Sequence, residues 1–223
     1  MCFSATASFV TATGLSIVSL LSIKEIPTKK LLPLAASPLF FAIQQFCEGL
    51  VWVTLNNGDA TSNLHTIGVY GFLFFAAIWW PIWIPFALYI PEKISARKKL
   101  LCMTMLIGLG SAVSLLFSWV LQITGAEIIN HHINYPVQNY SFSTTNTYLV
   151  QCISVATSLA YCAATIMPLF ISSIPYMWIE GIIICLGFLL TCIFYYLAFS
   201  SVWCFFAAAS NIMVYFIIKN YHT

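Results

Sequence analysis

The stretch AIQQFCEGLVW, residues 42–52, places three polar side chains inside a long apolar run at residues 31–55. That run is long enough to form a helix that crosses a membrane. Gln44, Gln45 and Glu48 are three and four residues apart, so they share one face of such a helix. Two amides and a carboxylate are costly in hydrocarbon unless they meet partners or water. The stretch therefore predicts a membrane protein with a polar interior.

The composition supports the same conclusion. The chain has 223 residues, of which 61% are hydrophobic and only 6% are charged. Soluble domains carry about 25% charged residues, so this chain cannot cover a surface that faces water, and we expect its main partner to be the lipid bilayer. The eight cysteines form no CxxC pair, and no basic tract or nucleic-acid motif is present. We expect neither a disulfide framework nor a nucleic-acid partner.

Seven apolar segments approach the roughly 20 residues that a spanning helix requires. We therefore expect an all-α fold, with residues 1–223 forming a single transmembrane domain, a polytopic bundle of seven transmembrane helices. Only Ser200 and Ser201 separate the last two segments, so we expect a tight turn or a re-entrant end there. The expected spans are residues 4–23, 31–55, 66–90, 100–123, 147–171, 177–198 and 202–219.

The basic residues predict the orientation. Cytoplasmic loops of membrane proteins are enriched in lysine and arginine. With the N-terminus outside and the C-terminus cytoplasmic, all eight basic residues lie on the cytoplasmic side, whereas the outer loops near 56–65 and 124–146 carry none. We expect a multi-pass protein of the cell membrane, the inner membrane of a bacterium. The basic residues are Lys24, Lys29, Lys30, Lys93, Arg97, Lys98, Lys99 and Lys219.

A second polar stripe follows the expected helix at 147–171. Its steps of three and four residues place its members on one helical face. Small polar residues often serve only to let helices approach closely, but large amides such as Gln151 and Asn211 bring several groups that need hydrogen-bond partners. We therefore expect the helices at 31–55 and 147–171 to face each other or a shared cavity. The stripe consists of Thr147, Gln151, Ser154, Ser158, Tyr161 and Thr165.

Glu48 is the ionisable residue of greatest interest. It lies about seven residues, roughly 10 Å, below the outer end of its helix. An acid inside the membrane marks a functional site by default, although a protonated acid bonded to neighbouring side chains would serve structure alone. Glu180 lies one turn from the cytoplasmic start of its helix, where we expect it to reach the interface. The candidate ligand-binding residues are Glu48, Gln44, Gln45, Gln151, Ser4 and Asn211.

The loop at 124–146 contains His131 and His132 on the expected outer side. Together with Glu48 they are candidate metal ligands, because histidine and carboxylate bind zinc and related metals. However, no HExxH motif exists, and adjacent histidines in a loop are more often solvated. The loop is longer than two helices need for their connection, so we expect it to fold over the outer mouth.

Three short stretches carry a resemblance to a known family: the opening MCFSATASF, the LPLA at 32–35 and the QQFCEGLVW at 44–52. They resemble an uncharacterised bacterial family of integral membrane proteins that share an MCFSATAS-type start and a (H/Q)Q-x-x-E block in the second helix. The resemblance covers nearly the whole chain and implies a membrane protein without an established activity or cofactor. It points to Cys2, Ser4, Thr6, Gln45 and Glu48 as positions to test.

Three functions are compatible with these patterns. The first is binding or transport of a small polar or cationic ligand at a polar site near Glu48, open to the outer face. The second is an intramembrane hydrolase, with or without a metal, that acts on a lipid-like substrate. The third is a structural bundle without a ligand. A cavity beside Glu48 favours the first, a cluster of histidine and carboxylate the second, and a tightly packed interior the third.

Overall fold

The computed structural model describes residues 4–123, 125–129, 131–136, 147–195 and 198–221. Within them the chain is almost entirely helical, apart from one short two-stranded hairpin. The elements are α1 Ala5–Glu25, η1 Lys29–Leu31, α2 Leu32–Asn56, α3 Asn63–Leu73, η2 Phe74–Trp79, α4 Trp80–Tyr89, α5 Ser95–Ser118, η3 Val120–Gln122, β1 Glu127–Ile129, β2 His132–Asn134, α6 Thr147–Ile171, α7 Met177–Phe194, α8 Phe199–Ser210 and α9 Ile212–Lys219.

Seven helical segments in the described residues are long and apolar enough to cross a membrane. They match the seven spans expected from the sequence, with boundaries that differ by a few residues. Four spans combine shorter elements: η1 continues into α2, α3 and α4 are joined through η2, α5 continues into η3, and α8 continues into α9. The break before the last span lies between Phe194, where α7 ends, and Phe199, where α8 begins, so Ser200 and Ser201, which were expected to mark it, lie inside α8.

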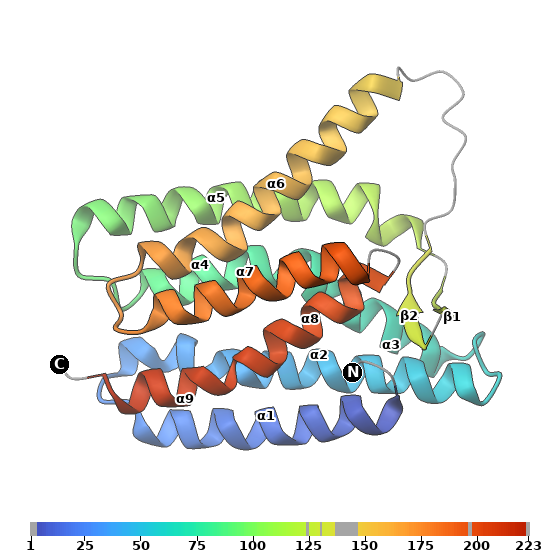
Figure 1. Cartoon of the computed structure of the whole chain (residues 1–223), viewed down its shortest axis with the longest axis horizontal. Helices are drawn as coiled ribbons and strands as arrows, with labels where there is room; N and C mark the ends of the chain where they lie inside the picture. The colour runs from blue at the N-terminus through green and yellow to red at the C-terminus, as the bar shows by residue number, and fades with distance from the viewer. Residues whose placement is uncertain (1–3, 124, 130, 137–146, 196–197, 222–223) are drawn as a thin grey trace.

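The helices run side by side along the long axis of the molecule (Figure 1). The ends of α1 and α9 lie at the same end of the bundle as the starts of α2 and α5. These are the segments that carry the eight basic residues, so we call this end the basic end. The β1–β2 hairpin lies at the opposite end, which we call the hairpin end (Figure 1).

The hairpin covers the hairpin end of the bundle. Ile133 of β2 is fully buried, and Tyr135 stacks on Phe72 of α3 with ring centroids 5.0 Å apart. Both residues pack in an apolar cluster with Trp52 of α2 and Cys204 of α8. The loop expected to fold over this end therefore does so with its described residues.

An irregular turn in the third span exposes backbone carbonyls that contact the neighbouring helices α6 and α5. Pro81 has no N–H to continue the helical ladder, and the preceding residues form a π-helical turn in which the Trp80 N–H bonds to the Phe75 carbonyl. The Ala76 carbonyl in this turn accepts a hydrogen bond of 2.6 Å from the Tyr161 hydroxyl of α6. Beside it, Gly108 of α5 admits the Pro81 carbonyl, which would lie 1.8 Å from any added Cβ.

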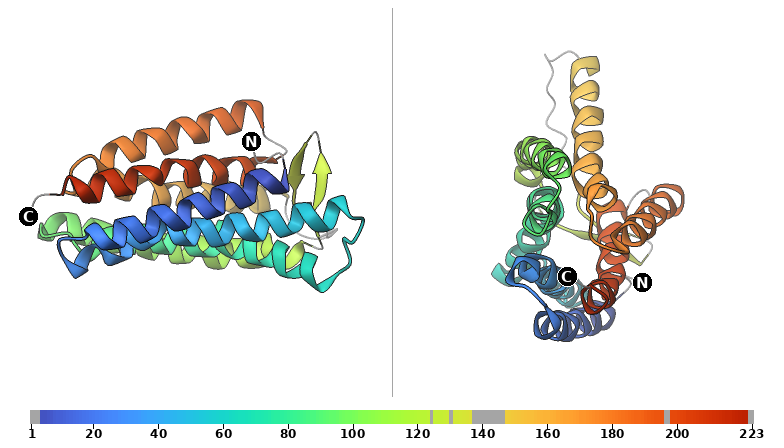
Figure 2. Two further views of the ribbon diagram at one scale, coloured as in Figure 1. Left: turned by 90° about the horizontal axis from the view of Figure 1, so that it is seen from below. Right: turned by 90° about the vertical axis from the view of Figure 1, so that its left-hand side faces the viewer.

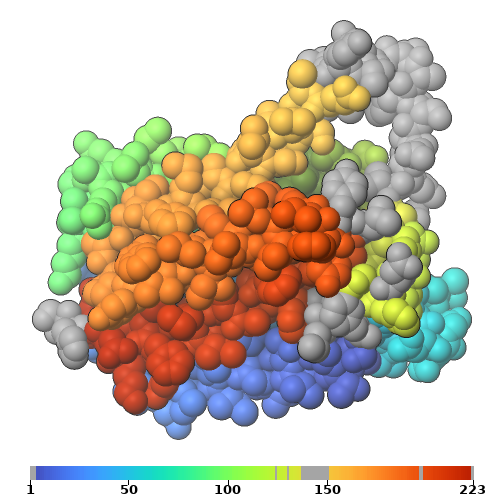
Figure 3. Space-filling model, viewed as in Figure 1, coloured from blue at the N-terminus to red at the C-terminus, as the bar shows by residue number. Residues whose placement is uncertain are grey.

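The helix α6 leaves the bundle along its length. At the basic end it packs against α4, α5 and α7, whereas towards the hairpin end it diverges from them (Figures 1 and 2). The space-filling view shows this half of α6 standing away from the body of the molecule (Figure 3). A groove of about 500 Å³ lies between α6 and the helices α5, α7 and α8, and Ser154 and Ser158 line it.

Candidate functional site

Glu48 lies at the centre of a buried polar cluster, which we call the Glu48 cluster and define as Gln44, Gln45, Glu48 and Ser201. Gln44, Gln45 and Glu48 are each 0% exposed, on the face of α2 that looks into the bundle. The Gln45 amide donates to Glu48 Oε2 at 3.2 Å, and the hydroxyl of Ser201 in α8 donates to Glu48 Oε1. The cluster therefore joins the second and seventh spans in the interior of the bundle.

Two amide atoms of the Glu48 cluster lack hydrogen-bond partners among the described residues. The Trp80 indole N–H donates to Gln44 Oε1 at 2.7 Å, and since an indole can only donate, this bond fixes the orientation of the Gln44 amide. Gln44 Nε2 then faces away from Trp80 and has no hydrogen-bond partner, and neither has Gln45 Oε1. Leaving a buried polar group unpaired costs about 1–3 kcal/mol, so these two atoms, one donor and one acceptor, are costly where they lie.

Close helix packing places the cluster in the interior. Gly49 follows Glu48 directly, and a Cβ at Gly49 would lie 2.6 Å from the ring of Phe9 in α1. The glycine thus lets α1 pack tightly against α2. On the other side, the rings of Phe41 and Trp80 stack with centroids 3.6 Å apart. These contacts hold the indole where it meets Gln44.

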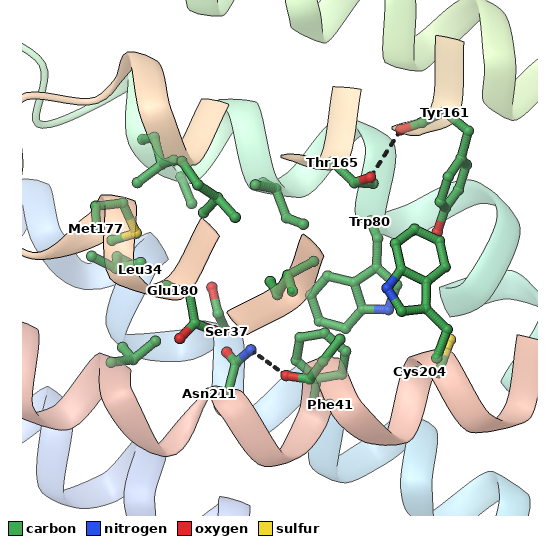
Figure 4. Close-up of a pocket in the computed structure, with 18 residues that line it drawn as sticks. Leu34, Ser37, Phe41, Trp80, Tyr161, Thr165, Met177, Glu180, Cys204 and Asn211 are labelled. Atoms are coloured by element: carbon green, nitrogen blue, oxygen red, sulfur yellow. Dashed lines mark hydrogen bonds between the residues drawn. The ribbon is translucent and has the colours of Figure 1, made fainter. Parts of the chain in front are cut away.

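A cavity of about 60 Å³ begins beside this cluster. Trp80 and Cys204 line it, and the Cys204 thiol also lies near the Gln44 amide and the Glu48 carboxyl. From there the cavity extends between the helices towards the basic end, where Met177 lines it (Figure 4). Its wall is mostly apolar and aromatic, so its few polar side chains define its chemistry.

Glu180 of α7 is the charged residue of this cavity. Its side chain is 3% exposed, so the expectation that it reaches the interface is wrong. The hydroxyl of Ser210 donates to Glu180 Oε1 at 2.7 Å, while Oε2 has no hydrogen-bond partner among the described residues. Ser37 and Asn211 lie next to the carboxylate in the cavity (Figure 4). The interior thus holds one buried acid near each end of the cavity.

The structure separates the remaining candidates from one another. Asn211 lies at the break between α8 and α9, where its amide donates to the Ala207 carbonyl at 2.9 Å, and it lines the cavity. Ser4 caps α1 by accepting a bond of 3.2 Å from the Ala7 N–H. Gln151 is exposed on the diverging half of α6, in a shallow hollow formed by α6 side chains alone. Of these three, only Asn211 joins the interior site.

The expectation that α2 and α6 share a cavity is correct for one half of α6. Tyr161 and Thr165 line the cavity together with Ser37 and Phe41 of α2. The other half of the stripe, including Ser154 and Ser158, is exposed along the lateral groove. The polar face of α6 therefore lines the interior cavity with one half and the lateral groove with the other.

The histidine pair lies in the hairpin. His131 is exposed at the turn with a φ of 63°, and the ring of His132 packs edge-on against Tyr195 with centroids 5.0 Å apart. Burial lowers the pKa of His132, which favours its neutral form. Among the described residues no three His, Cys, Asp or Glu side chains are placed to hold a metal ion, so His131, His132 and Glu48 are not gathered into a metal site.

Two serine partners of the buried acids, Ser201 and Ser210, are not indicated by the sequence pattern. Ser201 was considered only as a marker of a turn, and Ser210 was not considered. Each serine lies on the last span, on a face that meets a glutamate of another helix. A serine facing an acid across two helices leaves no pattern along the sequence, because it depends on how the helices rotate against each other.

The chain matches a family model described as "Family of unknown function (DUF6629)" over residues 1–223, and it belongs to that family. No curated protein and no solved structure matches it.

Proposed function

We propose that this protein is a multi-pass protein of the cell membrane that binds a small polar or cationic ligand at the Glu48 cluster. In this proposal the hairpin end faces outwards and the basic end faces the cytoplasm, in accordance with the positive-inside rule. The ligand enters from the hairpin end and can pass from the cluster into the cavity.

One observation carries the proposal: Gln44 Nε2 and Gln45 Oε1 are fully buried and have no hydrogen-bond partner among the described residues. Buried polar groups are nearly always paired, and a pair of unpaired groups beside a carboxyl group points to a bound water or ligand. Their neighbours Trp80 and Cys204 line a cavity, which offers a ligand space behind these two side chains, although no residue of the Glu48 cluster itself lines it.

The charge of the site favours a cation over an anion. None of the side chains that line the cavity is basic, and the cavity ends at a second acid, Glu180. Aromatic rings, which attract cations through their faces, line the path between them. Intramembrane acids arranged in this way are typical of pathways for cations or protons.

Chemical labelling of Cys204 tests the proposal, because this thiol lies beside the Glu48 cluster. Cys204 would be kept as the only cysteine, and the protein reconstituted in vesicles with the hairpin end outwards. We expect a small cationic reagent, aminoethyl methanethiosulfonate, to react about tenfold faster than its anionic sulfonate analogue, because a buried acid raises the local concentration of cations. The substitution Glu48→Gln should bring the two rates close together.

The matched control is Glu25→Gln, which makes the same change at an exposed position at the end of α1. It should leave the ratio of the two rates unchanged. If neither reagent labels Cys204 from the hairpin end, the cluster is sealed and its role is structural. If Glu48→Gln leaves the preference for the cation intact, Glu48 does not select the ligand.

A further inference from the structure

Glu180 carries an unused acceptor and lines a cavity between the helices. Its side chain is 3% exposed, and Oε1 is occupied by the Ser210 hydroxyl, whereas Oε2 has no partner among the described residues. The same carboxylate lines the cavity of about 60 Å³. Since a water molecule needs about 10–15 Å³ of such space, the cavity can hold a few waters or one small molecule.

Three other polar side chains of the cavity, Ser37, Thr165 and Asn211, also offer acceptors. The Thr165 hydroxyl donates to the Tyr161 carbonyl at 2.9 Å, and the Ser37 hydroxyl donates to the Pro33 carbonyl at 3.3 Å. Their hydrogens are therefore committed within their own helices. The Asn211 amide nitrogen likewise donates to its own helix. A molecule in the cavity thus meets these acceptors and one unpaired donor, the indole N–H of Trp203, so it must itself supply the donor for Glu180.

The walls complete the description of the ligand. The rings of Phe41, Trp80 and Trp203 line the cavity, and none of its lining residues is basic. Aromatic faces attract a cation and also accept an apolar substituent. A divalent metal is a poor fit, because calcium requires six to eight oxygen ligands and magnesium a strict octahedron. One carboxylate and a few neutral oxygens match a single positive charge.

We propose that the Glu180 cavity binds ammonium or a short primary alkylammonium, whose N–H groups donate to Glu180 Oε2 and whose carbon lies against the aromatic wall. This site is separate from the Glu48 cluster and extends the proposed function by a second binding position. It depends on Glu180 rather than on Glu48, so each proposal can fail without the other.

Calorimetric titration of the full chain in lipid nanodiscs tests the proposal, with methylammonium as the probe. We expect methylammonium to bind the wild-type protein. Its affinity should fall about 30-fold or more in Glu180→Gln, because the ammonium group then loses the carboxylate with which it pairs. Tetramethylammonium, which has no N–H donor, should not bind. The control Glu25→Gln carries the same substitution at an exposed site and should bind like the wild type.

A second variant guards against a folding defect. Ala207 lines the cavity, so Ala207→Leu fills the space and leaves the carboxylate in place. It should abolish methylammonium binding. In the wild type, methylammonium should change the infrared absorption of a carboxylate, and this change should be absent in Glu180→Gln and in Ala207→Leu. The proposal is overturned if the wild type does not bind methylammonium, or if either variant binds it with wild-type affinity.

Discussion

Two buried glutamates, Glu92 and Glu180, differ in the number of hydrogen-bond donors that their carboxyl groups receive. Glu92 lies in the loop between α4 and α5 and is 4% exposed, almost the same fraction as Glu180. Its carboxylate accepts four bonds of 2.9–3.0 Å, from the N–H groups of Lys93, Ile94 and Ser173 and from the Ser173 hydroxyl. Glu180 accepts one, from Ser210, its other oxygen has no hydrogen-bond partner among the described residues, and the residue lines a cavity.

The comparison shows that burial alone does not identify a functional acid. Burial raises the pKa of Glu92, but the hydrogen bonds from Ile94, Ser173 and Lys93 outweigh it, and the pKa lies below its usual value. Four hydrogen bonds thus stabilise the charged form of Glu92. Through them the carboxylate connects the α4–α5 loop to the α6–α7 loop. The number of donors that a buried acid receives, rather than its exposure, indicates what it does.

The largest expected effect is the loss of this connection. Glu92→Ala leaves the N–H groups of Ile94 and Ser173 without their acceptor, and hydrogen bonds to a charged group contribute about 1.5–3 kcal/mol each. We expect the free energy of unfolding to fall by about 3 kcal/mol, measured by detergent-induced unfolding. The exposed control Glu25→Ala should change it by less than about 0.5 kcal/mol. A similar fall in the free energy of unfolding in Glu92→Ala and Glu25→Ala would show that the hydrogen bonds to Glu92 do not stabilise the fold.

The second effect is a dependence on pH. A carboxyl group whose pKa is lowered by folding contributes stability above its unfolded pKa of about 4.3, and this contribution is lost as the pH falls through the folded value. The wild type should therefore lose stability below about pH 5, and Glu92→Gln should lose less over the same window. Unfolding midpoints measured from neutral to acidic pH test this. Parallel curves for the two proteins would show that Glu92 is not the group responsible.

Most of the fold could be predicted from the sequence, because the length and position of an apolar run decide where a chain can cross a bilayer. The expected span 147–171 coincides with α6, and the other six differ from their helices only at the ends. The divergence of α6 could not be predicted. A polar stripe shows that residues share a face, but not whether that face meets a cavity, as at Thr165, or an open groove, as at Ser154.

The candidate site was predicted only in part, for the same reason. The spacing of Gln44, Gln45 and Glu48 was sufficient to place them together, since they belong to one helix. Glu180 lies near the start of its helix in the sequence, and an acidic residue at such a position is usually expected to reach water. Its burial arises from the packing of α7 against the last span, which brings Ser210 to the carboxylate.

Replacing Glu180 by an apolar residue should stabilise the protein, in contrast to the loss of stability expected for Glu92→Ala. Glu180→Met exchanges an incompletely paired acid for an apolar side chain in a mainly apolar cavity, and replacing buried charged groups in this way is often stabilising. We expect the free energy of unfolding to rise by about 1–2 kcal/mol in detergent-induced unfolding. The same exchange at Glu92 should lower it, because Glu92 receives four donors. A loss of stability in Glu180→Met would show that this acid contributes to the fold as Glu92 does.

The smallest effect concerns a single donor. Ser173→Ala removes the hydroxyl bond of 2.9 Å to Glu92 Oε1 and leaves the backbone N–H of residue 173 on Oε2. We expect a loss of about 1 kcal/mol, since three donors remain on the carboxylate. In the background Glu92→Ala the same change should cost almost nothing, because the acceptor is already gone. A double-mutant cycle measures this difference, and a cost of Ser173→Ala that is equal in both backgrounds would mean that the hydroxyl stabilises the loop independently of Glu92.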